Sequence, residues 1–210
     1  ALPDAKQIRL RLALTSFKHV GVFPEQAVNW DFIYHSVKKL DVVQPKVLNL
    51  FAYTGAATLA AKVAGADIIH LDSIKQVITW AKENMTLSGL DNIRWLVEDA
   101  MTFVKREVKR GKKYQGIILD PPAYGHGPNG ENWKLEDEIN EMLANVRLLL
   151  EENHFLVLNT YSLGFSSIIL DNLLDEHFSK NIKRQTGEIF LQSTAGARLP
   201  LGVFARHCTV

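Results

Sequence analysis

Short hydrophobic runs alternate with segments of helical periodicity along most of the chain. A run of about five apolar residues is typical of a buried strand, whereas apolar residues three or four positions apart are typical of a helix. Regular alternation of the two predicts βαβ units on a parallel sheet. We expect strands over residues 47–51, 67–71, 93–97, 114–119 and 154–159, and helices over residues 57–64, 75–88, 100–110, 135–150 and 165–178.

The pattern changes after residue 178. Residues 182–192 and 199–210 both have the pattern of strands, and only residues 193–198 separate them. A connection this short cannot contain a crossover helix, so the two strands are predicted to form an antiparallel hairpin. The chain is therefore predicted to be an α/β protein with a Rossmann-like, doubly wound, mostly parallel sheet that is closed by a C-terminal hairpin.

The start of the chain stands apart from this repeating pattern. Residues 8–14 are strand-like, but no regular alternation follows them before the first predicted core strand. We expect residues 1–45 to form a lid or adaptor segment and residues 46–210 to form one domain. A chain of 210 residues is long enough for one domain with a large core.

Composition narrows the class of protein. The content of 47% hydrophobic and 22% charged residues is that of a globular protein, and a net charge of +1 gives no general attraction to nucleic acid. No apolar stretch approaches the roughly 20 residues of a membrane span, so we expect no membrane segment. Cys208 is the only cysteine, which excludes an internal disulfide and a zinc cluster. We expect no metal and a cytoplasmic location.

A nucleotide-binding turn is predicted directly after the first strand, because ligands of open α/β sheets bind beyond the carboxyl ends of the strands. The segment there is Phe51-Ala52-Tyr53-Thr54-Gly55, with one glycine where a dinucleotide fingerprint has three. Such a turn suits a pyrophosphate poorly, but the free N–H groups of the following helix can hold a carboxylate. S-adenosylmethionine (SAM), which carries a methionine carboxylate, suits it better than NAD. Candidate cofactor-binding residues are Phe51, Tyr53, Thr54 and Gly55.

Two aspartates follow the next two predicted strands. Asp72, with Ser73 beside it, can accept hydrogen bonds from ribose hydroxyls, and Asp99, followed by Ala100, can accept one from an adenine amino group. The alternative is that both aspartates are helix N-caps, a common role for Asp before a helix. Two carboxylates after successive strands, beside a glycine turn, favour a nucleoside pocket.

A second motif, Asp120-Pro121-Pro122-Ala123-Tyr124, follows the fourth strand at the centre of the sheet. Two prolines enforce extended backbone and remove two N–H donors, which leaves carbonyl groups free to face a substrate. With the carboxylate of Asp120 and the flat ring of Tyr124, the motif suits a planar, nitrogen-bearing acceptor, and a base reached in this way is unpaired or flipped out. Candidate catalytic residues are Asp120, Pro121, Pro122 and Tyr124, and Asp120 is also expected near the cofactor. The alternative is that the prolines merely end a strand.

Residues 125–133 form a glycine-rich stretch that is expected to be a mobile loop at the mouth of the site. Trp133 either lies at this mouth or packs on the following helix, and the sequence favours neither. His126 is compatible with a surface position, and we assign it no role in proton transfer.

These motifs resemble the bacterial class I SAM-dependent rRNA methyltransferases that modify cytosine or guanine of the large subunit. The resemblance covers most of residues 16–165 and rests on the turn at 51–55, Asp72-Ser73, the helix around Trp80-Ala81-Lys82-Glu83-Asn84, Glu98-Asp99-Ala100 and the segment at 120–124. The family's entry segment is matched by Gly21-Val22-Phe23-Pro24-Glu25-Gln26, which implies that Phe23 and Gln26 lie near the cofactor. The resemblance implies the class I methyltransferase fold, SAM as cofactor and rRNA as substrate.

The chain departs from this family at one chemically important place. Methylation of cytosine carbon-5 requires a cysteine that adds to the ring, and family members of that type place it just after the fifth strand. This chain has Thr160-Tyr161-Ser162 there, and Cys208 is best explained as a small buried hydrophobe. A nitrogen acceptor is therefore favoured. The RNA-binding appendage that family members often carry before this domain is not recognisable in the sequence.

The one basic cluster lies on and after the third predicted helix, where a solvated face is favoured over an RNA-docking patch; it consists of Lys105, Arg106, Lys109, Arg110, Lys112 and Lys113. We predict a SAM-dependent methyltransferase that acts on a base of RNA, with rRNA as partner. Two other classes stay open. An NAD-linked oxidoreductase is disfavoured by the single glycine, and a non-catalytic nucleoside- or RNA-binding module would bind SAM without transferring its methyl group.

Overall fold

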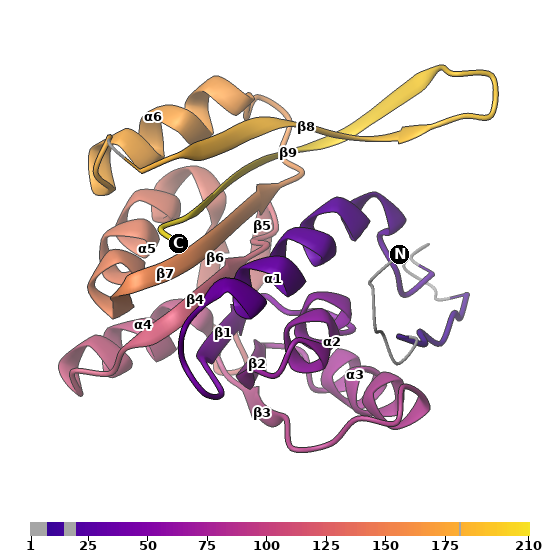
Figure 1. Ribbon diagram of the computed structural model, residues 1–210, viewed down its shortest axis with the longest axis horizontal. Helices are drawn as coiled ribbons and strands as arrows, with labels where there is room; N and C mark the ends of the chain where they lie inside the picture. Colours follow the sequence, from indigo (N-terminus) through magenta and orange to yellow (C-terminus); the bar gives the residue numbers. More distant parts are fainter. Residues whose placement is uncertain (1–7, 15–19, 181) are drawn as a thin grey trace.

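The computed structural model describes residues 8–14, 20–180 and 182–210 (Figure 1). In this part of the chain, helices cover both faces of a seven-stranded sheet. The sheet strands are β1 (Lys46–Leu50), β2 (Asp67–Asp72), β3 (Arg94–Val97), β4 (Tyr114–Leu119), β7 (Leu150–Thr160), β8 (Arg184–Gln192) and β9 (Arg198–Cys208). The helices are the short 3₁₀ helix η1 (Pro24–Gln26), α1 (Ala27–Lys39), α2 (Ala56–Val63), α3 (Lys75–Leu87), α4 (Ala100–Lys109), α5 (Leu135–Leu149) and α6 (Ser167–His177).

The strand order is β3-β2-β1-β4-β7-β9-β8. The first five strands of this order run parallel, and β9 lies antiparallel to both β7 and β8. The predicted doubly wound sheet with its C-terminal hairpin is therefore confirmed. After β3 the chain returns to the other side of β1, and this reversal between β1 and β4 opens a crevice at the carboxyl ends of the two strands.

Alternating side chains of the central strands build one core on each face of the sheet. On β4, Ile117 and Leu119 join the core under α4, α5 and α6, whereas Ile118 joins the core under α1, α2 and α3. All three side chains are buried, and burial of each contributes about 1.5–3 kcal/mol of hydrophobic free energy. Both faces are filled in this way, so the strands hold the crevice on a rigid base.

The N-terminal part differs from the sequence-based expectation. Residues 8–14 form no strand, whereas α1 is a regular helix that the sequence pattern did not predict. Ile33 and Val37 of α1 pack in the same core as α2. Asn29 and Ser36 are also buried on α1, and these polar residues interrupt the apolar periodicity that would have revealed the helix.

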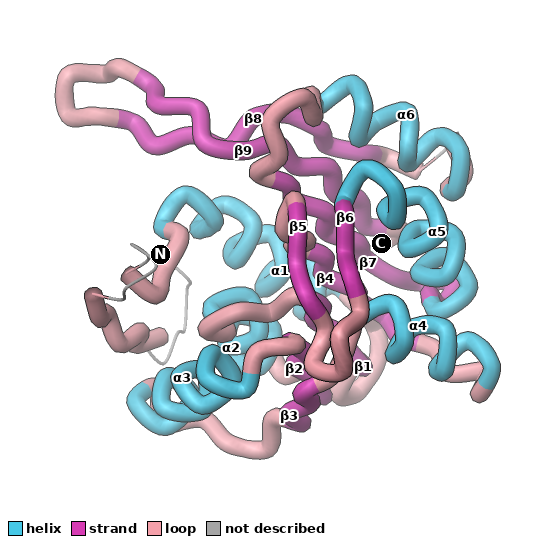
Figure 2. Tube along the Cα trace, turned by 180° about the vertical axis from the view of Figure 1, so that it is seen from behind, coloured by secondary structure: helices cyan, strands magenta, loops and turns pink. Residues whose placement is uncertain are grey.

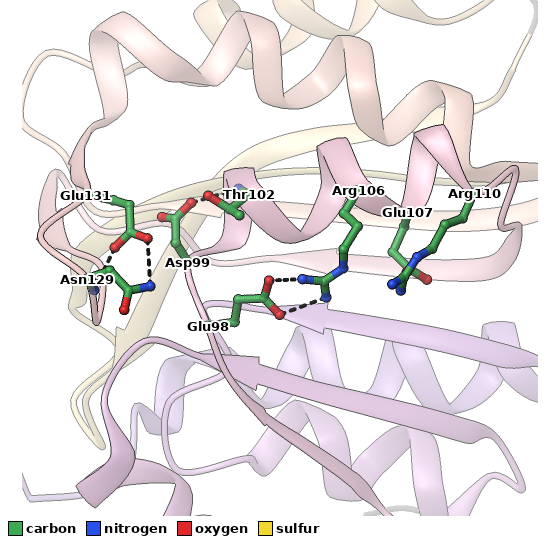
Figure 3. Close-up of polar contacts among 8 residues, drawn as sticks. All are labelled: Glu98, Asp99, Thr102, Arg106, Glu107, Arg110, Asn129 and Glu131. Atoms are coloured by element: carbon green, nitrogen blue, oxygen red, sulfur yellow. Dashed lines mark hydrogen bonds and ion pairs between the residues drawn. The ribbon is translucent and has the colours of Figure 1, made fainter.

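Residues 125–133, expected to be a loop, contain a small hairpin of β5 (Tyr124–His126) and β6 (Asn132–Lys134). The carboxylate of Glu131 closes its turn by accepting hydrogen bonds from the backbone N–H and the side-chain amide of Asn129, at 2.9 and 3.1 Å (Figure 3). The larger hairpin of β8 and β9 projects from the body, as the rear view in Figure 2 shows. Within the described ranges, no helix is both long and apolar enough to cross a membrane.

Candidate active site

The turn after β1 has unusual backbone conformation. Phe51 and Tyr53 have φ angles of +56° and +49°, and Gly55 has +90°. Residues with side chains adopt this region only at a cost, so the surroundings have to fix the turn. Asp72, at the end of the adjacent strand β2, does so, because its Oδ2 accepts a hydrogen bond from the Tyr53 N–H over 2.9 Å.

A second set of contacts ties the turn to the segment before η1. The Thr54 hydroxyl donates to the Gly21 carbonyl over 2.8 Å, and the Asn84 side chain of α3 donates to the Thr54 carbonyl over 2.9 Å. Gly21 itself has φ +92°, and a Cβ there would lie 2.1 Å from a ring atom of Trp80. Glycine is therefore required at position 21 for the entry segment to pack on the turn.

The crevice consists of two adjoining pockets that share Phe51. The inner pocket lies between β1, β4 and the start of α1 and brings together Phe23, Gln26, Tyr53, Thr54, Gly55, Asp120 and Asn159. The outer pocket lies beyond β2 and β3 and brings together Asp72, Ser73, Asp99, Ala100, Pro122 and Trp133. Of the candidate residues, Pro121 and Tyr124 line neither pocket.

The two aspartates of the outer pocket also organise the backbone. Asp99 Oδ1 accepts from the Thr102 N–H over 2.7 Å and caps α4, as Figure 3 shows. Asp72 Oδ1 accepts from the Ile74 N–H over 2.9 Å, but Ile74, not Asp72, is the cap residue of α3. Burial raises the pKa of Asp72, and backbone N–H groups that donate to it oppose this rise. The N-cap alternative is thus correct for Asp99 alone, and it leaves the other carboxylate oxygen for a ligand.

Trp133 belongs to the wall of the outer pocket. Its ring lies 4.8 Å from that of Phe51, only 5% of its surface is exposed, and its Nε1 donates to the Pro122 carbonyl over 2.7 Å. The Ala123 carbonyl accepts from the Leu135 N–H over 3.0 Å. The expectation that the diproline carbonyls face a substrate is therefore wrong for Pro122, since the protein itself occupies that carbonyl.

Asp120 lies at the end of β4, on the floor of the inner pocket. Its Oδ1 accepts from Asn159 Nδ2 over 2.9 Å, and its Oδ2 accepts from Gln26 Nε2 over 3.3 Å. Burial raises the pKa of Asp120 to about 7, with a further rise from the negative charge of Glu25 and an opposing effect of the Asn159 hydrogen bond. Near neutral pH this carboxyl group can therefore exchange a proton.

Three residues near Asp120 were not identified from the sequence. Asn159 is the second-to-last residue of β7, Glu25 is buried in η1, and the Tyr161 hydroxyl donates to Glu25 Oε1 over 3.1 Å. Asn159 and Tyr161 had a detectable signal, because Asn159 is the last residue of the fifth predicted strand and Tyr161 lies just beyond it. Phe23, which was identified, lies with its ring 5.5 Å from the rings of both Tyr53 and Tyr161.

Tyr124, a candidate catalytic residue, and His126 lie on β5 beside the outer pocket. Tyr124 is 69% exposed on β5. His126, at the other end of β5, contacts Asn132 through its Nδ1 at 2.9 Å and lines the outer pocket. A stacking surface at Tyr124 is therefore available to an incoming ligand from outside the crevice.

The basic cluster is largely engaged by the protein. Arg106 makes a two-pronged pair with Glu98, drawn in Figure 3, and Lys105 and Arg110 pair with Glu141 and Glu107 at 2.7 and 3.1 Å. The α4 helix starts at the outer pocket and leads away from it, so the cluster lies toward the amino ends of the strands. This placement favours a solvated face, as expected.

Cys208 is equally remote from the crevice. On β9 it pairs with Phe155 in the middle of β7, whereas Thr160 at the carboxyl end of β7 pairs with Val203. Cys208 is partly buried and packs against the core under α1. Among the described residues, no group of three or more His, Cys, Asp and Glu side chains could hold a metal ion.

Comparison with known proteins identifies the family of the domain. The family described as conserved hypothetical protein 95 matches residues 25–173, from η1 into α6. The chain belongs to this family. A curated relative is the ribosomal RNA large subunit methyltransferase K/L of Shewanella frigidimarina, 31% identical over 153 residues. Another is the ribosomal RNA large subunit methyltransferase K of Neisseria meningitidis serogroup B, 28% identical over 146 residues.

These alignments cover 71% and 67% of this chain, but only 20% and 40% of the two relatives. The chain thus spans about a fifth of the Shewanella protein. Among solved structures, the SAM-dependent methyltransferase of Agrobacterium tumefaciens superposes with a TM-score of 0.89 at 40% identity, covering 93% of this chain and 66% of the other. The protein SMU.776, complexed with SAH, superposes with a TM-score of 0.72 at 21% identity. The match covers 90% of this chain and 50% of SMU.776, and it shows that the fold is shared.

The predicted class I SAM-dependent methyltransferase family and fold are therefore confirmed, as are the enzyme class and SAM as cofactor for this domain. The pockets suit that cofactor physically. Carboxylates in the outer pocket can meet ribose hydroxyls and an adenine amino group, and the rings of Phe51 and Trp133 offer apolar walls. In the inner pocket, the buried Oδ1 of Asn159 has no hydrogen-bond partner among the described residues, so it can accept a hydrogen bond from a ligand.

Proposed function

We propose that the protein containing this methyltransferase domain acts on a base of ribosomal RNA and that the accepting atom is a nitrogen. The observation that carries the proposal is the buried carboxylate of Asp120 on the floor of the inner pocket. The names of the curated relatives support rRNA as the substrate class. An rRNA substrate also implies a location in the cytoplasm.

We assign the two pockets to different parts of SAM. Asp72 and Asp99 would accept hydrogen bonds from the ribose and the adenine amino group, and hydrogen bonds to charged groups contribute about 1.5–3 kcal/mol each. The backbone N–H groups at the start of α2, after Gly55, would hold the methionine carboxylate. Phe23 and Gln26 would cover the inner pocket, consistent with a lid role for part of residues 1–45.

We assign Asp120 to the acceptor. When bound, SAM supplies an electrophilic methyl group on a positively charged sulfur. Asp120 accepts a hydrogen bond from an exocyclic amine, which keeps the nitrogen lone pair from delocalising into the ring and directs it toward the methyl group. As the new N–C bond forms and the S–C bond breaks, the nitrogen loses one proton, and Asp120 can take it up near neutral pH. Tyr124 at the rim would stack on the flipped-out base.

The positions of the polar groups argue against a carbon acceptor. Methylation at cytosine carbon-5 needs a thiolate within reach of the ring. Thr160 ends β7 on the side of the crevice and Tyr161 follows it, whereas Cys208 pairs with Phe155 in the middle of β7. A nitrogen acceptor needs no covalent bond between the enzyme and the base, and it uses the carboxylate that is present.

The test is mass spectrometry of rRNA nucleosides from cells with and without the gene. We expect one N-methylated nucleoside to disappear without the gene, to return with the wild-type gene, and to stay absent with Asp120→Asn. This substitution keeps the shape of the side chain and removes its charge. Unchanged rRNA nucleosides would contradict rRNA as the substrate, and restoration by Asp120→Asn would favour a non-catalytic binding module. Loss of a C-methylated nucleoside would contradict the nitrogen assignment.

A further inference from the structure

A chain of hydrogen bonds connects Arg206 on β9 with Asp120 at the end of β4. Arg206 Nη1 donates to Asn29 Oδ1 over 3.0 Å, and Asn29 Nδ2 donates to Gln26 Oε1 over 2.7 Å. Gln26 Nε2 then donates to Asp120 Oδ2 over 3.3 Å. Because both amide side chains are buried, the connection between the two charged groups is shielded from water.

The guanidinium group of Arg206, the first donor in this series of hydrogen bonds, is held in place by several contacts. Arg206 Nε donates to Gln185 Oε1 over 2.8 Å, and Nη1 also donates to the Val28 carbonyl over 2.9 Å. Its Cζ lies 4.7 Å from the ring centroids of both Phe32 and Phe204. A planar guanidinium between two rings keeps its donors in fixed directions.

This arrangement determines which way each amide points. An Asn or Gln side chain has nearly the same shape when it is turned over, so its shape alone does not fix the direction. Arginine has donors and no acceptor. Asn29 therefore turns its oxygen toward Arg206 and its NH₂ group toward Gln26. Gln26 in turn directs its NH₂ group at Asp120, where a protonated Oδ2 would meet another donor.

We propose that Arg206 is a positioning residue of the acceptor site, because it fixes the direction of the Asn29–Gln26 chain and thereby keeps Asp120 Oδ2 an acceptor. The inference rests on the proposed function in so far as the substrate amine needs the carboxylate form of Asp120. Without Arg206, both amides are free to reverse, and Gln26 can then present its oxygen to a protonated Asp120.

The other groups around Asp120 show why a hydrogen bond of fixed direction from Gln26 matters. Glu25 of η1 contributes a negative charge, and burial also favours the neutral acid, so both raise the pKa of Asp120. The hydrogen bond from Asn159 acts in the opposite direction, and the Tyr161 hydroxyl donates to Glu25. The Gln26 NH₂ group, whose direction Arg206 fixes, therefore adds its hydrogen bond to that of Asn159 in holding the carboxylate form.

The experiment is a titration of Asp120 itself, in protein without substrate, by carbon-13 NMR of aspartate-labelled protein. The spectrum of Asp120→Asn assigns the resonance. Arg206→Gln replaces the guanidinium with an amide that can point either way. Asn29→Ala keeps the positive charge of Arg206 but interrupts the chain of hydrogen bonds between Arg206 and Gln26. We expect the pKa of Asp120 to rise by about one unit or more in both variants.

Arg198→Gln is the matched control. Arg198 also lies on β9 and stacks on an aromatic ring, with its Cζ 4.7 Å from the Phe190 centroid, but it begins β9 beside the turn of the hairpin, where it pairs with Gln192. We expect no shift in this variant, and thermal unfolding verifies that each variant folds. An unchanged pKa in folded Arg206→Gln would overturn the proposal. A rise in Arg206→Gln without one in Asn29→Ala would overturn it too, because charge alone would then explain the effect.

The titration needs no acceptor, so its outcome is independent of the rRNA experiment. A raised pKa in both variants would support the role of Arg206 even if rRNA were not the substrate. Conversely, confirmed rRNA methylation with an unchanged pKa would leave the proposed function intact and remove only this inference.

Discussion

Asn159 donates a hydrogen bond to Asp120, with 2.9 Å between Nδ2 and Oδ1, and this contact joins the carboxyl ends of β7 and β4. The oxygen of the same amide is buried without a partner among the described residues. The two side chains therefore offer the inner pocket one charged and one neutral acceptor. A ligand that brings hydrogen-bond donors satisfies both, as an amine-bearing base or the ammonium group of SAM would.

Asp120→Asn should slow methyl transfer while the domain still binds SAM. The substitution removes the charged acceptor and places an NH₂ group between the donors of Asn159 and Gln26. We expect kcat to fall by about 100-fold or more, as is usual when a general acid–base group is lost. Single-turnover kinetics with rRNA from cells lacking the gene measures this, and a rate equal to that of the wild type would contradict the role of Asp120.

The charge state of Asp120 also gives a pH dependence. With a pKa of about 7, the carboxylate form grows as pH rises through that value, so kcat should rise and then level off. For stability the sign is opposite. The folded-state pKa lies above the ordinary value of 3.8, so folding favours the protonated form, and its stabilising contribution is lost as pH rises through about 7.

Thermal unfolding of the wild type and Asp120→Asn, compared from about pH 4 to pH 9, tests the stability effect. The amide variant does not ionise at this position, so its melting temperature should rise relative to that of the wild type as pH increases from about 4 to about 7, and the difference should then stay constant. A constant difference across this range would show that Asp120 keeps an ordinary pKa.

Asp72→Ala should abolish most of the stabilisation by SAM. At a hundredfold excess over its dissociation constant, a ligand stabilises the folded state by about 2.7 kcal/mol. Asp72 lines the outer pocket and also holds the Tyr53 N–H, so its loss removes a ligand contact and loosens the turn. Asp67→Ala, at the exposed beginning of the same strand, should leave the SAM-induced shift of the melting temperature unchanged. Equal shifts in the two variants would exclude Asp72 from the site.

Gly55→Ala should weaken both folding and SAM binding. A side chain at φ +90° costs about 1–2 kcal/mol, and the added Cβ would lie 3.2 Å from the Cβ of Ala81. Gly65, with φ +105° and no atom within 4 Å of an added Cβ, is the control for the conformational cost alone. Calorimetric titration with SAM should show weaker binding only for Gly55→Ala. Equal affinities would place the cofactor away from this turn.

The sequence was sufficient to predict the sheet and the residues after its strands. Buried strands carry short apolar runs, such as residues 117–119 of β4. The carboxyl ends of parallel strands meet at one edge of the sheet, so Asp72, Asp99 and Asp120 could be placed at that edge from their positions alone. The N-cap role of Asp99 was also among the alternatives, because Asp is common before helices.

The parts that were missed depend on contacts distant in the sequence. Asn29 and Gln26 are buried polar residues whose partners come from β9 and β4, and no local pattern indicates such a connection. The engagement of the Pro122 carbonyl by Trp133 depends on how the hairpin of β5 and β6 folds back. Sequence periodicity reports which face of an element is apolar, and it carries little information about polar residues on a buried face.

The central claim is that SAM lies across both pockets with its methyl group directed at Asp120. A crystal structure with bound SAH tests this most directly. We predict the adenosine beside Asp72 and Asp99, the amino-acid end at the Gly55 turn, and the sulfur facing Asp120. A crevice left empty at saturating SAH, or a sulfur directed away from Asp120, would contradict the account.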